Sequence, residues 1–461
     1  MKNIFFFQLI IGSLIFSNSS ILAQSGNKEF SDYIATVEEI EIDSVIADFP
    51  VSFAMVTSAG WQFVAYYNKR RELSVASRKL TSKLWNYAIL PTRVGWDSHN
   101  YISIAIDKDN CVHVSGNMHA DSMLYFKTTR PFDITSFQKI FPLVSAEDEL
   151  KCTYPQFLKI NANELVFFYR KGGSGNGNTI FLKYDEKSRS FSKLYTKPLF
   201  DGLGQMSAYM EGPILGPDGY YHMVWVWRDT PDCETNHDWS YARSKDLIFW
   251  EALGSAQNQL PITPLSVHYT VDPVPPKGGS LNGVVKLFFN GSHKAHLVYM
   301  KYDSLGNSQL FIARPEQNKW HIRQLSDWTY RWDFSGPGTI DNHIRLTSAS
   351  FKSPNRISVK YWHIKKGFGE LIIDSAFRVL SDSIITESEN SEYPSQLLKP
   401  QSTYKGMSVK WARGFVENNS FDFYGLRWET TGIRRYNDKP LEKVPPSILK
   451  LYRFQKLPSK K

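Results

Sequence analysis

The sequence predicts an all-β fold, arranged as a single seven-bladed β-propeller. Stretches with the 3.6-residue period of amphipathic helices are nearly absent from the 461 residues. Short runs of β-branched and aromatic residues alternate instead with turns rich in Gly, Asn, Asp and Pro, which is the pattern of successive antiparallel strands. Examples of these runs are residues 61–67, 101–106, 164–169, 220–227, 284–290 and 356–362.

A looser repeat groups the strands into blade-sized units. Tyr241 to Trp250 reads as a degenerate form of the Ser-x-Asp-x-Gly-x-x-Trp turn of sialidase-like propellers, without its glycine. Similar units, at spacings of about 50–70 residues, are each long enough for one four-stranded blade. They span 73–90, 124–140, 180–195, 310–325, 357–380 and 407–436. The apolar run 449–454 is expected to pair with the first blade and close the ring, because closure removes exposed strand edges.

Two stacked β-sandwich domains are the alternative arrangement. No Pro, Gly and Ser-rich stretch of linker length separates two halves of the chain, so one propeller domain over residues 25–461 is expected. The first 24 residues have another character: Lys2 precedes the largely apolar run 4–16, a polar patch follows, and Ala23 offers a cleavage point. This layout is that of a secretory signal peptide. We therefore expect a secreted or periplasmic protein, without a later segment that spans a membrane.

Composition narrows the class of partner. Three cysteines are too few for a disulfide framework, so folding must depend on an apolar core, for which 42% hydrophobic and 15% aromatic residues suffice. The formal net charge of +9 favours anionic ligands through long-range attraction. Nucleic acid and sulfated or uronate-rich polysaccharide are both ligands of this kind. Apart from Lys69 to Arg71 and the Lys460-Lys461 tail, the basic residues are scattered and form no compact nucleic-acid patch.

The most informative segment runs from residue 96 to residue 130. His99 stands before a predicted strand and His119 after the next one, with a turn near Asn110 between them. An antiparallel hairpin returns both of its ends to the same sheet edge, so His99 and His119 are expected to be neighbours in space. His113, inside a strand, is expected to be structural.

Two further segments repeat this arrangement. Tyr154 precedes a predicted strand, and Arg170 follows the next one and is followed in turn by a Gly-rich loop that lets a ligand approach the backbone. Tyr209 and Arg228 flank the following pair of strands and are candidates for substrate binding. Taken singly, each residue has a structural explanation, and the functional hypothesis rests on their recurrence at successive hairpin edges.

These segments resemble the ulvan lyases with seven-bladed propeller folds, and the related propeller lyases that cut rhamnose–glucuronate linkages. The resemblance is carried by His99 and His119, which are 20 residues apart, and by Tyr154 and Arg170, which are 16 apart. The run from 227 to 246 also matches. The likeness covers about residues 61–250, whereas the last third matches only in its blade-like pattern.

The resemblance implies a β-elimination at a uronate. Arg170 and His119 would donate to the C6 carboxylate and stabilise the charge that develops on it. Tyr154 and His99 would serve as the base that removes the C5 proton and the acid that protonates the leaving oxygen, in an order that the sequence leaves open. Tyr209 would bind substrate or assist proton transfer, and Arg228 would bind substrate. The cleaved bond would join rhamnose, possibly sulfated as in ulvan, to the uronate. The expected partner is therefore an anionic polysaccharide and no nucleic acid, and the protein is expected to act as a monomer.

No cofactor is expected to be required for catalysis, but the resembling families carry a structural zinc. Cys233 and His237 are four residues apart in a polar loop and are the candidate metal ligands. Two ligands at this spacing are a weak signal, because structural zinc sites have four. Cys152 and either His222 or His268 would complete the set only if the fold brought them there.

Other functions and another substrate remain open from the sequence. A sialidase-like glycoside hydrolase would need a carboxylate pair or an Arg triad, and the available acids are Asp97, Glu211 and Asp229. A non-catalytic carbohydrate-binding propeller would also agree with the aromatic residues and the positive charge. For a lyase, the alternative substrate is rhamnose-capped glucuronate in arabinogalactan.

Overall fold

A computed structural model describes residues 33–160, 164–256, 260–415, 422–432 and 443–457. The predicted signal peptide, residues 1–24, lies outside the described residues. The all-β prediction is confirmed: α1 (Glu387–Asn390) is the one α-helix in the described ranges, beside short 3-10 turns. None of the described helices is long and apolar enough to cross a membrane.

Most strands belong to four-stranded antiparallel sheets that follow one another along the chain. The first contains β2 (Ala54–Ser58), β3 (Trp61–Tyr67), β4 (Glu72–Lys79) and β5 (Asn86–Arg93). The second contains β6 (Ile102–Ile106), β7 (Val112–Gly116), β9 (Tyr125–Thr128) and β10 (Phe137–Lys139). Two later sheets contain β21 (Val285–Phe289), β22 (Ala295–Tyr302), β23 (Ser308–Glu316) and β24 (Lys319–Gln324), and then β25 (Ile344–Ser353), β26 (Arg356–His363), β27 (Gly367–Asp374) and β28 (Val379–Ile384).

A larger sheet of 11 strands lies between these groups in the sequence, as far as the described residues show. It contains two four-stranded meanders joined by one parallel residue pair, Gly177 with Ser207. The first meander is β11 (Cys152–Ile160), β12 (Glu164–Gly173), β13 (Asn176–Asp185) and β14 (Ser190–Lys193). The second is β15 (Ser207–Leu215), β16 (Tyr221–Arg228), β17 (Asn236–Ser244) and β18 (Trp250–Ala252). The short strands β8 (His119–Asp121), β19 (Ser255–Ala256) and β20 (Thr270–Asp272) complete the sheet.

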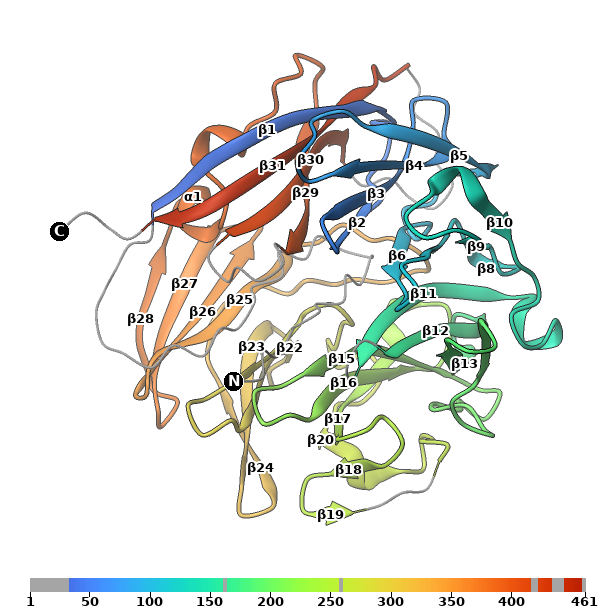
Figure 1. The fold of residues 1–461 in the computed structure, drawn as a ribbon. Coiled ribbons are helices and arrows are strands. Elements are labelled where there is room, and N and C mark those ends of the chain that lie inside the picture. The colour runs from blue at the N-terminus through green and yellow to red at the C-terminus, as the bar shows by residue number, and fades with distance from the viewer. Residues whose placement is uncertain (1–32, 161–163, 257–259, 416–421, 433–442, 458–461) are drawn as a thin grey trace.

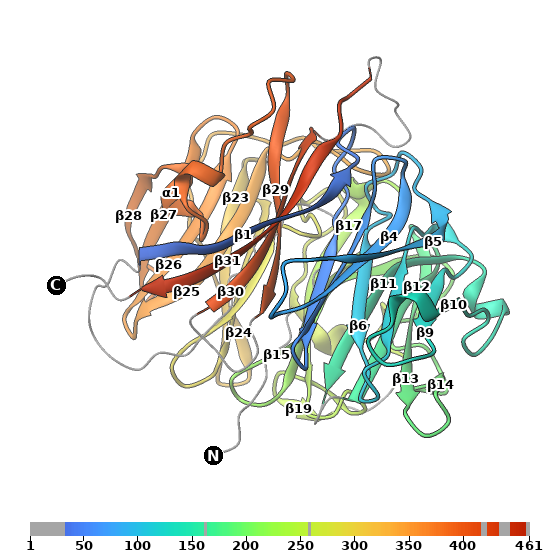
Figure 2. The ribbon, with the colours of Figure 1, turned by 45° about the horizontal axis from the view of Figure 1, so that its top comes forward.

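The last sheet joins the two ends of the described chain. β31 (Ser447–Leu457) pairs on one side with β30 (Asp422–Thr431), which pairs with β29 (Met407–Phe415), and on its other side with β1 (Tyr33–Val45). The apolar run 449–454 therefore pairs with a strand that precedes the first sheet, rather than with the first sheet itself. Figure 2 shows β1 and β31 lying side by side.

The sheets are arranged around the molecule in chain order, so that each one packs against its neighbours (Figure 1). Strands β2, β6 and β29 come from three different sheets, and β2 contacts both of the others. The apolar side chains between the sheets form continuous buried clusters, one of which reaches from Val45 through Phe63 and Val114 to Leu451. All three cysteines are buried and free, which confirms that the described fold depends on apolar packing and not on disulfides. The site described below lies where the inner strands of neighbouring sheets meet.

Candidate active site

His99 and His119 lie together, as the hairpin argument predicts. Their ring centroids are 4.3 Å apart and their planes differ by 24°. His99 is held in the loop before β6, whereas His119 begins β8, which leaves its own sheet and pairs with β11 of the next one. This change of sheet places His119 opposite Thr153, the residue next to Tyr154.

Asp97 lies between the two histidines and was considered from the sequence only as an acid for a hydrolase. His99 Nδ1 is 2.6 Å from one carboxylate oxygen, and His119 Nδ1 contacts the other. The His99 backbone N–H also donates to Asp97, at 3.0 Å. Although burial acts in the opposite direction, the hydrogen bonds from His119 and His99 hold the pKa of Asp97 well below its usual range. The cluster thus carries an ionised carboxylate beneath two imidazoles.

A β-bulge positions Tyr154. The pairing of β11 with β12 shifts register between Thr153 and Gln156, and Tyr154 adopts a positive φ of 60°. A bulge of this kind turns a side chain away from its place in the regular ladder. The Tyr154 ring lies 6.1 Å from His99, and the Arg170 guanidinium lies over its face at 4.9 Å.

Arg170 is buried, and its environment explains the Gly-rich loop after it. A Cβ at Gly177 would lie 3.1 Å from Arg170 Cδ and closer still to backbone oxygens, so a larger residue would displace the arginine. Arg170 Nη1 donates to the Tyr209 hydroxyl at 3.0 Å, and Ser174 of the same loop contacts that hydroxyl at 2.5 Å. Arg170 Nε is buried without a hydrogen-bond partner among the described residues. A buried donor of this kind is expected to bind a ligand or water.

The structure brings Arg228 into the same group. Its guanidinium lies 3.9 Å from the centre of the Tyr209 ring. It is held by Asn236 at 2.7 Å and by Asn282 at 2.6 Å, neither of which was singled out from the sequence. All six predicted catalytic and substrate-binding residues therefore lie in one connected cluster, built from three successive strand groups.

The pKa values of the ionisable groups diverge within this cluster. Burial lowers the pKa of His99, which keeps the imidazole neutral near pH 7, and raises the pKa of Tyr154 to about 12. Burial also acts to raise the pKa of Tyr209, but the charges of Arg170 and Arg228 outweigh it and hold this pKa below its ordinary value. Two tyrosines whose rings are 6.3 Å apart thus differ in their tendency to ionise.

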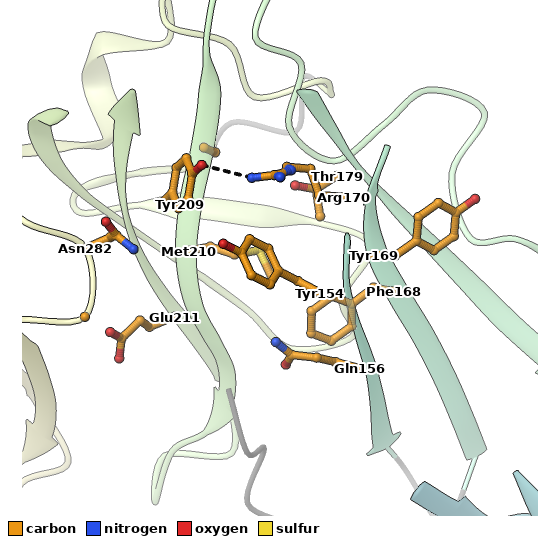
Figure 3. A pocket seen from close by; sticks show the side chains of 12 residues that line it. Tyr154, Gln156, Phe168, Tyr169, Arg170, Thr179, Tyr209, Met210, Glu211 and Asn282 are labelled. Atoms are coloured by element: carbon orange, nitrogen blue, oxygen red, sulfur yellow. Dashed lines mark hydrogen bonds between the residues drawn. The ribbon is translucent and has the colours of Figure 1, made fainter. Parts of the chain in front are cut away.

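A pocket opens beside the cluster (Figure 3). Tyr154, Arg170 and Tyr209 line it, together with Glu211 from β15 and Gln156 from β11. In Figure 3 the Glu211 carboxyl lies away from Arg170, with Tyr154 between them. Burial raises the pKa of Glu211 to about 7, although the Lys286 charge acts against this shift. The pocket therefore has a cationic end at Arg170 and an opposite end where the Glu211 carboxyl ionises near pH 7.

The candidate zinc ligands are placed differently. Cys233 lies in an apolar cluster with Val284 and Trp332, and burial raises its pKa to about 11. Both ring nitrogens of His237 are hydrogen-bonded to carboxylates, to Asp229 at 3.0 Å and to Asp238 at 2.9 Å.

Within the described ranges, neither Cys233 nor His237 joins a group of three or more potential metal ligands. The other residues considered for this site are engaged elsewhere: Cys152 packs in another apolar cluster, and His222 is hydrogen-bonded to Asp218 and Tyr241. The described surroundings thus do not provide the four ligands of a structural zinc site, and zinc binding stays a prediction. The described group that has suitable atoms within 4.8 Å of one another is Asp97, His99 and His119.

The acids considered for a hydrolase also have other partners. Asp97 binds the two histidines, Asp229 binds His237, and Glu211 lies in the pocket near Lys286. Asp97 and Asp229 thus bind histidines and Glu211 lies in the field of Lys286, and none of these observations pairs two of the acids.

A family model described as "BNR repeat-containing family member" matches residues 61–328. The chain belongs to the BNR repeat-containing family. Among curated proteins, no sequence matches this BNR repeat-containing chain.

Solved structures agree with this family at the level of fold. The polysaccharide lyase Uly1 is 12% identical, with a TM-score of 0.62 over 91% of this chain and 99% of its own. A PL25 ulvan lyase bound to -[GlcA(1-4)Rha3S]- is also 12% identical, with a TM-score of 0.52 over 85% of this chain and 93% of its own. The BNR repeat-containing chain therefore shares the fold of propeller polysaccharide lyases, as the resemblance in its sequence predicts.

Proposed function

We propose that this protein is an exported polysaccharide lyase that cleaves the bond between rhamnose and a 4-linked uronate by β-elimination. The observation that carries the proposal is the placement of a neutral imidazole, His99, and a protonated phenol, Tyr154, beside the buried Arg170 guanidinium. An elimination needs these three functions together: a base, an acid, and a cation for the carboxylate. The fold shared with propeller lyases supports the same reaction class.

The scaffold of this enzyme is a single seven-bladed propeller over residues 25–461. Five four-stranded sheets and the two meanders of the larger sheet supply the seven blades, the last of which contains both β1 and β31. This arrangement brings β11 and β15 of successive blades to one pocket, with β6 packed against β11.

The first step neutralises the uronate carboxylate. Arg170 donates from its unpartnered Nε, and His119, which is stacked on His99 and uses Nδ1 for Asp97, is the second donor through the Nε2–H of its protonated ring. A carboxylate that accepts charge-assisted hydrogen bonds can take up the enolate charge, which makes the C5 proton acidic enough to remove. Arg228 and Tyr209 hold the sugar at the cationic end of the pocket.

Proton transfer then follows from the two pKa values. His99, neutral because burial lowers its pKa, accepts the C5 proton, and the C5–H electron pair forms the C4=C5 double bond. The C4–O4 bond breaks, and Tyr154, which holds its proton up to a pKa of about 12, protonates the leaving oxygen. The products are a rhamnose reducing end and an unsaturated uronate. His99 returns its proton to solvent and Tyr154 is reprotonated, so the enzyme is regenerated.

Ulvan is the proposed substrate, and rhamnose-capped glucuronate in arabinogalactan is the alternative. The positive net charge favours a sulfated polymer, and the PL25 ulvan lyase of similar fold was solved with a sulfated rhamnose–glucuronate ligand. A non-catalytic binding propeller would have the same fold, but it would have no need of the divergent pKa values of His99 and Tyr154.

The test is the ultraviolet absorbance of unsaturated uronate during incubation with ulvan and, in parallel, with gum arabic. We expect the wild type to produce it, and His99→Ala and Tyr154→Phe to lose about 10²–10⁴-fold in kcat. Matched controls are His321→Ala on the outer strand β24 and Tyr87→Phe on the outer strand β5, which should retain wild-type rates. Folded wild-type protein with no absorbance on either polymer would overturn the lyase proposal and favour a binding protein.

A further inference from the structure

Asp97 is the one carboxylate that contacts both histidines of the candidate site, as far as the described residues show. Its two oxygens are divided between them: Oδ1 is 2.6 Å from His99 Nδ1, and Oδ2 contacts His119 Nδ1. The Asp97 side chain is 7% exposed and that of His99 8%, whereas that of His119 is 19% exposed. The carboxylate therefore binds both stacked imidazoles, and the His119 ring is the more exposed of the two.

The chemistry of the contact assigns the hydrogens. An ionised carboxylate can only accept hydrogen bonds, so each Nδ1 must carry the hydrogen that it donates. A neutral imidazole that is protonated on Nδ1 has its lone pair on Nε2, at the opposite side of the ring. Both rings are therefore restricted to one orientation, in which Nε2 is turned away from Asp97.

We propose that Asp97 is a positioning residue that holds His99 and His119 in the Nδ1–H form and presents both Nε2 atoms to the sugar. The assignment of hydrogens stands on the geometry alone, whereas its consequence for catalysis rests on the proposed lyase function. In that reaction His99 Nε2 is the atom that accepts the C5 proton, and His119, in its protonated form, donates to the carboxylate through Nε2–H. Without Asp97 the His99 ring can rotate or carry its hydrogen on Nε2, and in either case the lone pair is no longer presented.

A second Asp–His pair in the same molecule provides a matched control. His113 Nε2 is 3.0 Å from Asp107, and its Nδ1 contacts the Tyr125 hydroxyl. The His113 side chain is 0% exposed and lies among aromatic rings, where no substrate reaches it. Substitution of Asp107 thus perturbs a buried Asp–His pair of the same kind without touching the candidate site.

The first experiment measures tautomers directly, by two-bond ¹H–¹⁵N correlation spectra of histidine-labelled protein. For the wild type we expect His99 and His119 both to carry hydrogen on Nδ1. In Asp97→Asn one of the two oxygens is replaced by a donor NH2 group, so the Nδ1–H that faced this oxygen loses its acceptor. At least one of the two rings should then change to the Nε2–H form, while Asp107→Asn should leave both rings unchanged. If the Asn variant does not fold, the wild-type spectrum still tests the assignment.

The second experiment compares kinetics and the pH profile. Asp97→Asn should lose about 10²–10⁴-fold in kcat with little change in KM, because a group that acts in proton transfer is misplaced. The Asp97 charge raises the pKa of His99 against the effect of burial. Its removal should therefore move the acid limb of the kcat profile to lower pH, a change that a purely structural role would not produce.

Three outcomes would overturn the proposal. One is a wild-type spectrum in which either ring lacks hydrogen on Nδ1. Another is an Asn variant with unchanged tautomers and unchanged kcat. The third is a metal ion, present at one equivalent in the wild type and lost with Asp97, whose removal by chelator abolishes activity, since Asp97 would then be a ligand. By contrast, a wild type that shows the expected tautomers but no elimination would contradict the proposed lyase function. The positioning of the two rings by Asp97 would still be established.

Discussion

Burial and positive charge act in opposite directions on the groups that line this pocket. Burial raises the pKa of Tyr154 to about 12, but the two arginines beside Tyr209 reverse the direction there. His99 loses basicity through burial and regains part of it from Asp97. Pairs of titratable groups whose environments separate their pKa values are typical of sites that perform acid–base chemistry.

Glu211 gives a prediction for the pH dependence of substrate binding. Its carboxyl has a pKa of about 7 and ionises as the pH rises, so it adds negative charge to a pocket proposed to bind a uronate. Lys286, whose pKa burial lowers to about 8, also begins to lose positive charge toward the upper end of this range. We expect KM for the polymer to rise several-fold from about pH 6 to about pH 8 in the wild type, and to rise less in Glu211→Gln, where only the loss of the Lys286 charge remains.

The measurement is the KM for the polymer at a series of pH values, with the exposed Glu147→Gln as control. A Gln variant with the same KM profile as the wild type would show that Glu211 does not titrate in contact with substrate.

The site residues differ in how far the sequence could predict them. Hairpin geometry is local, and it was enough to bring His99 to His119 and to place Tyr154 near Arg170. The role of Asp97 could not be predicted, because it depends on β8 leaving one sheet to pair with another. No local pattern encodes such an exchange, since it is decided by the packing of two sheets.

At the scale of elements, the interiors of strands could be predicted from the sequence, but the pairing of one strand with another could not. The run 61–67 coincides with β3 (Trp61–Tyr67), and 101–106 differs from β6 (Ile102–Ile106) by one residue, because alternating apolar side chains report burial directly. Apart from Pro155, no sequence pattern indicates the bulge at Tyr154. β1 was not predicted at all. Three glutamates interrupt the apolar positions of β1, and its partner, β31, is more than 400 residues away.

β22 carries a residue that should govern acid stability. His296 is 3% exposed, its ring is 5.0 Å from that of Phe351, and burial lowers its pKa to about 4. Below its unfolded value of about 6.5, the unfolded chain takes up a proton that the folded state does not, so stability is lost as the pH falls from about 6.5 to about 4. His296→Phe removes this titration. The variant should lose less stability over that range than the wild type, by up to about 3 kcal/mol.

Urea unfolding at several pH values in this range measures the difference, with the exposed His321→Gln as control. Parallel losses of stability in His296→Phe and the wild type would contradict the prediction.

At the scale of the whole molecule, the net charge of +9 should act on encounter with an anionic polymer. Attraction between a cationic protein and a polyanion is screened as salt shortens the Debye length from about 10 Å at 0.1 M to about 3 Å at 1 M. We expect kcat/KM for the polymer to fall by about tenfold or more over this range, with kcat at saturation nearly constant. A kcat/KM that is insensitive to salt would show that the charge does not steer the substrate.

Pairing between the two ends of the described chain makes its stability depend on one strand. β1 pairs with β31 along most of its length and contributes Ile40, Ile42 and Val45 to the buried apolar surface. Glu38 of this strand also pairs with Arg78, whose side chain is 0% exposed. Burial of three aliphatic side chains stabilises by about 5–9 kcal/mol, and removal of Glu38 leaves a buried charge without its ion-pair partner. The sum approaches the whole stability of a typical domain.

A variant that starts at Ile46 should therefore fail to unfold cooperatively and should aggregate through the exposed edge of β31. A variant that starts at Tyr33 keeps β1 and should have the thermal unfolding midpoint of the longer chain. Scanning calorimetry and light scattering on both variants make the comparison. If the shorter variant has the same midpoint and stays monodisperse, β1 is dispensable, and the remaining sheets hold the fold without a strand that ties its two ends together.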